Sequence, residues 1–126
     1  MKQWICACLF AMLIFSGNLH ALEIADAAIT SSIANRNAVD SLNTVKGPVA
    51  QLFCFTRVVD AQEDTWITHV WYYEGKEMAR VRLAVSSSNW RTWSSKKILP
   101  EWVGQWQVHI LDELGKARLI VPFMIE

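Results

Sequence analysis

Apolar and polar residues alternate with a period of two along most of the chain after residue 22. This alternation is typical of half-buried β-strands, and no segment there keeps the 3.6-residue period of a helix over more than about two turns. Clusters of turn-forming residues separate the alternating segments. The pattern predicts an all-β domain with seven strands, at residues 23–33, 49–59, 65–73, 77–85, 90–95, 104–111 and 117–125.

The predicted strands differ in the strength of their pattern. Residues 65–73 are rich in Thr, Ile, Val, Trp and Tyr, which suit a pleated, half-buried surface. The alternation at residues 23–33 is weak because it uses Ala and Ser, so a helix remains an alternative there. Short connections with Gly75 and Gly115 predict hairpins after residue 73 and after residue 111.

Seven short strands at spacings of about 8 to 12 residues favour a two-sheet antiparallel β-sandwich of the immunoglobulin-like or fibronectin type. A small barrel is the alternative architecture. Trp71 stands in the third strand, where sandwiches of this class often bury a Trp at the centre of the core. Alternation in the sixth strand points Trp106, Val108 and Ile110 toward the same core.

The N-terminal residues have the organisation of a secretory signal peptide. Lys2 supplies a positive charge, residues 5–15 are an apolar run, and a polar exit ends at Ala21. We expect a signal helix with cleavage after Ala21, or alternatively after Ala27. An uncleaved anchor is a further alternative, although a spanning helix needs about 20 apolar residues. The predicted product is one exported domain, residues 22–126, that is periplasmic or otherwise extracytoplasmic and meets a membrane only if the signal is uncleaved.

Composition narrows the classes of function. The chain carries 12 basic and 12 acidic side chains, so it lacks the basic face that nucleic-acid binding requires. Beyond residue 21, Cys54 is the only cysteine, which excludes an internal disulfide. We expect it to be a small buried hydrophobe, the alternative being an intermolecular disulfide or a reactive thiol. No spacing of His and Cys indicates a metal site, and no motif indicates a cofactor.

Five blocks of sequence carry a resemblance to a known family. They are AAITSSIANR (27–36), FCFT (53–56), THVWYYEGK (68–76), WRTWSSKK (90–97) and GQWQVHILDELG (104–115). Together they resemble the bacterial domain-of-unknown-function family 2914 over nearly the whole chain after residue 21. The resemblance implies an exported or membrane-tethered domain and brings no established activity. The chain departs from it at residues 36–38, where Arg-Glu-Pro is expected, and at Ile29 and Cys54, where aromatic residues are expected.

The segment 90–97 holds the strongest candidates for ligand binding. Alternation sends Trp90 and Trp93 to opposite faces of the strand, so we expect one to be in the core and the other exposed. An exposed Trp beside Arg91 and Lys96 would form an aromatic and cationic platform for a sugar ring or an anionic group. The alternative is that Arg91 only stacks on Trp93 and covers it.

His69 lies two residues before Trp71, so both side chains leave the same face and we expect His69 to be buried and hydrogen-bonded. It is also a candidate ligand-binding residue. A catalytic role with Ser94 or Ser95 is a weaker hypothesis, because no G-x-S-x-G elbow or oxyanion hole is recognisable.

The sequence favours a non-catalytic binding module of the cell envelope, with a glycan or a protein as its partner. Two alternatives stay open: a structural or assembly component of an envelope complex, and a small hydrolase using His69 with Ser94 or Ser95.

Overall fold

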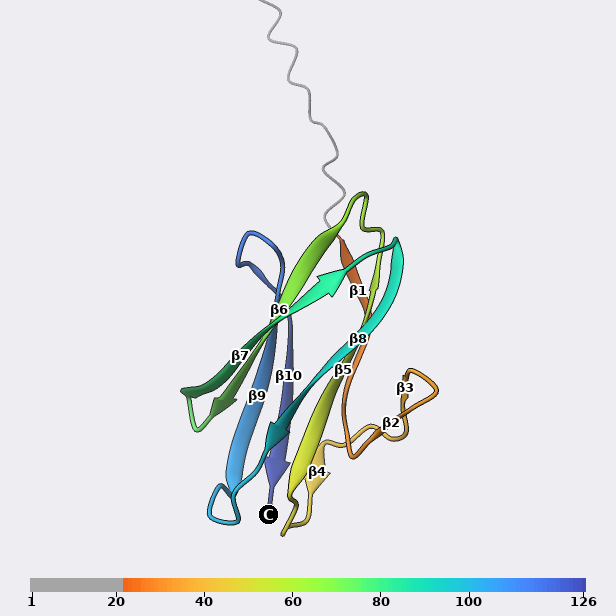
Figure 1. The fold of residues 1–126 in the computed structure, drawn as a ribbon. Coiled ribbons are helices and arrows are strands. Elements are labelled where there is room, and N and C mark those ends of the chain that lie inside the picture. The colour runs from red at the N-terminus through yellow and green to blue at the C-terminus, as the bar shows by residue number, and fades with distance from the viewer. Residues whose placement is uncertain (1–21) are drawn as a thin grey trace, which may run out of the picture.

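The computed structural model describes residues 22–126, and every regular element in this range is a β-strand. Residues 1–21, on which the predicted signal helix and its cleavage site fall, lie outside the described residues. The strands are β1 (Glu23–Thr30), β2 (Ile33–Ala34), β3 (Asn37–Ala38), β4 (Thr44–Val45), β5 (Gln51–Val59), β6 (Thr65–Tyr73), β7 (Lys76–Val85), β8 (Asn89–Lys97), β9 (Gly104–Leu111) and β10 (Ala117–Ile125) (Figure 1).

The all-β prediction is confirmed, but the prediction of seven strands is wrong, because the described residues form ten. The three additional strands, β2, β3 and β4, have two residues each and lie where the sequence predicts only the end of a strand and a polar connection. A two-residue strand shows no periodicity, so alternation cannot reveal it. The first strand ends at Thr30 instead of at residue 33. At its end the Asp40 carboxylate accepts hydrogen bonds from the side chains of Thr30 and Ser31.

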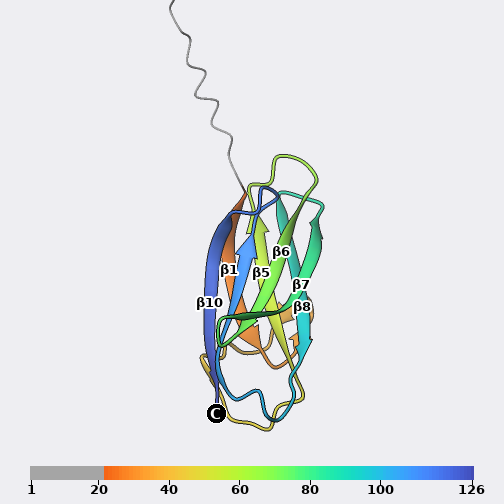
Figure 2. The ribbon, with the colours of Figure 1, turned by 90° about the vertical axis from the view of Figure 1, so that its left-hand side faces the viewer.

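The strands form two large layers and one small hairpin. One sheet has the order β1-β5-β8, the other has the order β4-β10-β9-β6-β7, and β2 pairs with β3. All pairings are antiparallel except that of β4 with β10. Figure 1 shows the two layers beside each other, and Figure 2 looks onto the five-stranded sheet with the other behind it. The architecture is therefore sandwich-like, as the strand spacing predicts.

The core fills the space between the two sheets. Trp71 and Trp106 are almost completely buried there, and both contact the ring of Phe123 from β10, at centroid distances of 6.2 and 5.8 Å. Two buried aromatic side chains of this size remove a few hundred Å² from water, which stabilises the fold without a disulfide. Cys54 is free and buried, and burial raises the pKa of its thiol to about 12, so it packs as the expected hydrophobe.

Two hairpins of the sandwich are closed by two-residue turns. Glu74 and Gly75 connect β6 and β7 and both have positive φ, as a two-residue type I′ turn requires. This confirms the hairpin predicted from Gly75. Asn35 and Arg36 connect β2 and β3 in the same way, with φ values of 52° and 60°. Among residues 22–126, no helix is long and apolar enough to cross a membrane.

Candidate functional site

Trp90, Arg91 and Trp93 lie on β8, which is an edge strand of the three-stranded sheet. Arg91 and Trp93 belong to its outer face, and Trp90 packs at the margin of the core. The expectation of one core Trp and one exposed Trp is wrong, because both are half-buried. An edge strand leaves one flank open, so the inward-pointing Trp90 keeps part of its surface in solvent.

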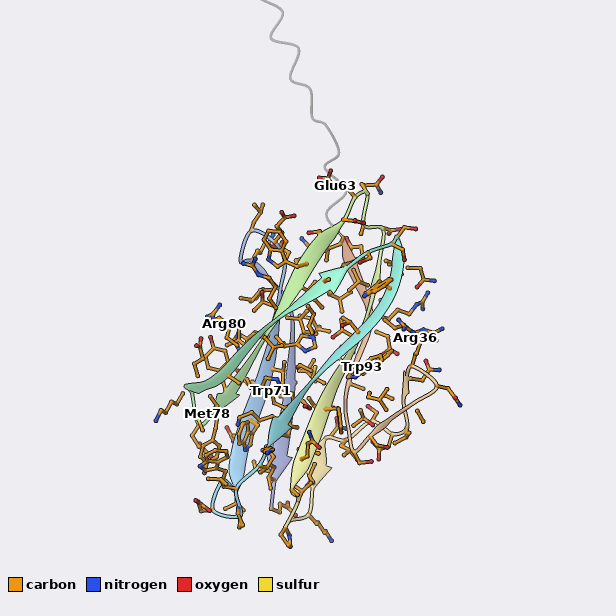
Figure 3. The ribbon with its side chains drawn as sticks, in the orientation of Figure 1. Arg36, Glu63, Trp71, Met78, Arg80 and Trp93 are labelled. Carbon is orange, nitrogen blue, oxygen red and sulfur yellow. The ribbon has the colours of Figure 1, made fainter. Side chains whose placement is uncertain are left out.

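Arg36 reaches β8 from the β2–β3 turn. Its guanidinium carbon lies 5.7 Å from the ring centroid of Trp90 and 5.9 Å from that of Trp93, within cation–π range of both. Its Nη2 donates a hydrogen bond of 3.2 Å to the main-chain oxygen of Arg91. Figure 3 shows Arg36 on the outer side of β8, on the same flank as Trp93. The arginine that covers the two rings is thus Arg36 and not Arg91, the residue proposed from the sequence.

The backbone of Arg36 is in an unfavourable conformation. At φ 60° an L-residue other than Gly, Asn or Asp meets steric conflict, which costs about 1–2 kcal/mol. Asn35, the other turn residue, tolerates this region, and Gly is the usual choice at the second position of a type I′ turn. In this turn the Arg36 side chain lies against β8. The sequence alone does not connect Arg36 with this surface, because Arg36 precedes Trp90 by more than fifty positions, although Asn35 next to it is typical of turns.

Lys96 does not belong to this surface. Alternation along β8 sends its side chain to the opposite face from Arg91 and Trp93. Its ammonium nitrogen is 5.0 Å from the ring centroid of Trp102 and donates to the main-chain oxygen of Lys97. Of the four residues of the predicted platform, three lie together: Trp90, Arg91 and Trp93. Lys96 lies apart from them.

His69 is buried between the sheets in a chain of hydrogen bonds, as its position beside Trp71 predicts. Its Nδ1 lies 2.6 Å from Ser94 Oγ, and its Nε2 lies 2.8 Å from Thr56 Oγ1. Trp71 Nε1 donates to the same Ser94 oxygen at 3.0 Å. The chain therefore joins β6 of one sheet to β5 and β8 of the other. Figure 3 shows Trp71 between the layers.

The Trp71 indole can only donate, so Ser94 Oγ accepts from it. The neutral His69 ring donates through one nitrogen and accepts through the other, and the hydroxyls of Ser94 and Thr56 can each take either role. Burial lowers the pKa of His69 to about 3, so the ring is neutral at pH 7. The arrangement satisfies the polar atoms of the core and leaves both ring nitrogens occupied.

This arrangement gives the hydrolase hypothesis no geometric support. A nucleophilic serine must meet its substrate, but Ser94 is 5% exposed and His69 is 0% exposed. Ser95 is exposed but belongs to the outer face of β8, away from the His69 ring. Within residues 22–126, no group of three His, Cys, Asp or Glu is placed to hold a metal ion.

Two shallow hollows on the described surface contain none of the predicted site residues. The larger, about 260 Å³, lies near the C-terminus and is lined mainly by Pro48, Val49, Leu99, Pro100 and Val103. The smaller, about 150 Å³, lies on the five-stranded sheet and is lined by Tyr72, Glu74, Gly75, Gln105 and Gln107. The Trp90–Trp93 surface follows the edge strand β8, so a ligand there would lie across that edge.

A family model described as "Protein of unknown function (DUF2914)" matches residues 64–121 of the chain. The match includes the blocks 68–76, 90–97 and 104–115, and with them Trp90, Arg91 and Trp93. It leaves residues 22–63 outside, so the resemblance is confirmed for the later blocks and not over nearly the whole chain. A search among curated proteins found no match to this chain.

Proposed function

We propose that the protein is an exported, non-catalytic binding module of the cell envelope, and that its ligand lies across the outer edge of β8. The proposal places Arg36, Trp90, Arg91 and Trp93 in one binding surface, and leaves His69 and Lys96 out of it. The observation that carries it is the guanidinium of Arg36, which lies within 6 Å of two half-buried Trp rings and is fixed by the Arg91 carbonyl.

A guanidinium held in this way is prepared for binding. Its orientation is set by the two rings and by one hydrogen bond, so less side-chain entropy is lost when a ligand engages its remaining N–H groups. Trp90 and Trp93 each keep part of their surface in solvent beside Arg36, and a sugar ring can pack against that apolar surface. These properties favour a glycan of the envelope as the ligand.

Export is proposed from residues 1–21, and the fold is consistent with the expected cleavage. Leu22 is buried, and its main-chain oxygen accepts a hydrogen bond from Arg118. Cleavage after Ala27 would remove five of the eight residues of β1, which pairs with β5. A mature chain that begins at Leu22 keeps the strand complete. Division of the seven long strands into three and four supports the proposal that the module is of the immunoglobulin-like or fibronectin type.

Intrinsic Trp fluorescence tests the proposal. The purified protein is titrated with peptidoglycan fragments and envelope polysaccharides, alone and as the variants Trp93→Ala and Arg36→Gly. Trp66→Ala is the matched control, because Trp66 lies on the other sheet and is also covered by an arginine. The guanidinium carbon of Arg82 is 4.3 Å from the ring centroid of Trp66. We expect a saturable change that Trp93→Ala and Arg36→Gly abolish and Trp66→Ala retains. A response that survives both β8 variants contradicts the placement of the site, and a flat response to all ligands contradicts glycan binding.

A second candidate function, an assembly component of an envelope complex, is favoured by the edge of the larger sheet. β10 is paired on its outer side only at Met124 and Ile125, by β4. The upstream part of this edge carries the exposed side chains of Leu119 and Ile120. An unpaired strand with apolar side chains is suited to strand addition by a protein partner. Crosslinking in the native host that recovers only this chain would count against this function.

A further inference from the structure

The outer face of the three-stranded sheet brings positive charges together. Arg57 on β5 and Arg91 on β8 are direct partners in the antiparallel register, so their side chains leave the same face. Directly opposite residues have Cβ atoms about 4.5–5.5 Å apart, and like charges at such positions destabilise a sheet. Arg36 adds a third guanidinium through its hydrogen bond to the Arg91 carbonyl.

Nearby acidic residues do not neutralise these arginines. Within residues 22–126, the ion pairs shorter than 4.0 Å involve Arg80 and Arg118, not Arg36, Arg57 or Arg91. Asp26 is the register partner of Arg57 on β1, but Arg57 Nε donates instead to Asn89 Oδ1 at 3.0 Å.

Two further carboxylates of the same sheet and its connection, those of Asp40 and Glu23, are engaged elsewhere. Asp40 accepts hydrogen bonds from Thr30 and Ser31, which hold its pKa below the usual value. Glu23 lies 3.5 Å from Arg118. If Asp26 is counted against Arg36, Arg57 and Arg91, these three arginines keep two uncompensated positive charges. Residues 22–126 as a whole have a net charge of −1, because they carry 11 basic and 12 acidic side chains.

The arrangement combines these charges with an aromatic surface. Of the hydrogen bonds found among the described residues, Arg36 makes one through Nη2, Arg57 makes one through Nε, and the Arg91 guanidinium makes none. A guanidinium has five N–H donors in a planar fork that matches a carboxylate. The Trp93 side chain lies beside these donors, one outward position along β8 from Arg91. A ligand that uses both the Trp93 side chain and the arginine donors has a ring that packs on the tryptophan and an anionic group that pairs with the guanidinium groups.

We infer that the ligand of this surface is an acidic glycan, in which a carboxylate-bearing sugar stacks on the Trp90–Trp93 edge and pairs with Arg36, Arg57 and Arg91. This inference rests on the proposed function and narrows it to one chemical class. The group of three arginines fits a short acidic oligosaccharide and not a long polyanion, since the chain as a whole has no net positive charge.

A matched pair of ligands tests the charge requirement. Tetragalacturonate carries a carboxylate on each ring, and its fully methyl-esterified form has the same rings without the charge. We expect the acid to bind the purified protein at least ten-fold more tightly than the ester in 20 mM NaCl, with the difference shrinking in 0.5 M NaCl as the charges are screened. Equal binding of acid and ester overturns the inference and leaves glycan binding intact. Binding of neither, together with a flat response to neutral and acidic envelope polysaccharides, overturns both proposals.

Variants locate the charge requirement on the surface. We expect Arg57→Gln and Arg91→Gln each to lower the affinity for the acid by five-fold or more, while the affinity for the ester stays within two-fold. Arg82→Gln is the control, because Arg82 also covers a Trp but projects from the five-stranded sheet. An equal loss in Arg82→Gln, or no loss in Arg57→Gln and Arg91→Gln, overturns the assignment. Circular dichroism and urea unfolding establish that each variant is folded.

Discussion

Arg36→Gly separates the strain in the β2–β3 turn from the contacts that the side chain makes. Loss of the two ring contacts costs about 0.5–1 kcal/mol each at a partly exposed site. Gly relieves about 1–2 kcal/mol of strain at φ 60°, and its greater freedom in the unfolded chain costs about 0.5–1 kcal/mol. The expected result is a free energy of unfolding about 0.5–1 kcal/mol below that of the unmodified protein.

Arg36→Ala is the comparison that makes this prediction sharp. Alanine removes the same contacts but keeps a Cβ in the left-handed region, so we expect a loss of about 1–2 kcal/mol. Urea unfolding, followed by far-ultraviolet circular dichroism with a common m-value, measures both variants. The Gly variant should be more stable than the Ala variant by at least about 0.5 kcal/mol. The reverse order would refute the account of strain, and a loss above about 3 kcal/mol in both would show that Arg36 holds the fold together.

Three further predictions concern the core, a turn and the N-terminus. Burial lowers the pKa of His69 to about 3, so as the pH falls the histidine is protonated in the unfolded chain before it is protonated in the folded protein. The free energy of unfolding should therefore fall as the pH drops below 6.5, by about 2 kcal/mol at pH 5. Urea unfolding at pH 8, 6.5 and 5 should show this slope, and the variant His69→Gln, where it folds, should lack it. Gly104→Ala should lower the free energy of unfolding by about 1–3 kcal/mol, measured by thermal unfolding, because φ is 129° and a Cβ would overlap the Glu74 carboxylate. That carboxylate accepts a hydrogen bond from the main-chain N–H of Gln105. Gly115→Ala is the control and should cost less, because open space surrounds Gly115. Intact-mass analysis of the exported protein should give a chain that begins at Leu22, and a chain that begins at residue 28 would contradict the cleavage argument.

Alternation predicted the long strands because each has one face in the core. β6 matches its predicted bounds, and Trp106, Val108 and Ile110 are buried as expected. The first strand was ambiguous because its small residues give little contrast between faces, and pairing with β5 decides that it is a strand. The short strands β2, β3 and β4 depend on contacts made after the chain has folded, so no local pattern announces them.

The candidate site was only partly predictable for a related reason. Trp90, Arg91 and Trp93 are neighbours in sequence, and one strand holds them together. Arg36 and Arg57 join them through the β2–β3 turn and through the register of β5 with β8, which composition and periodicity do not specify. Lys96 was included on sequence proximity alone, and alternation along β8 turns it to the other face, where it meets Trp102.

The two polar groupings of the sandwich differ in a way that indicates where function lies. The hydrogen-bonded chain from Trp71 through Ser94 and His69 to Thr56 is closed, and no buried side-chain nitrogen or oxygen of the described residues lacks a partner. Such a network stabilises a particular arrangement of the core and has no capacity left for a ligand. The surface around β8 instead places two arginines directly opposite each other, with no acidic side chain of residues 22–126 paired to either. Exceptions to local rules of this kind are expected at functional sites. The anionic ligand that we propose would supply the opposite charge that the Arg57–Arg91 pair lacks.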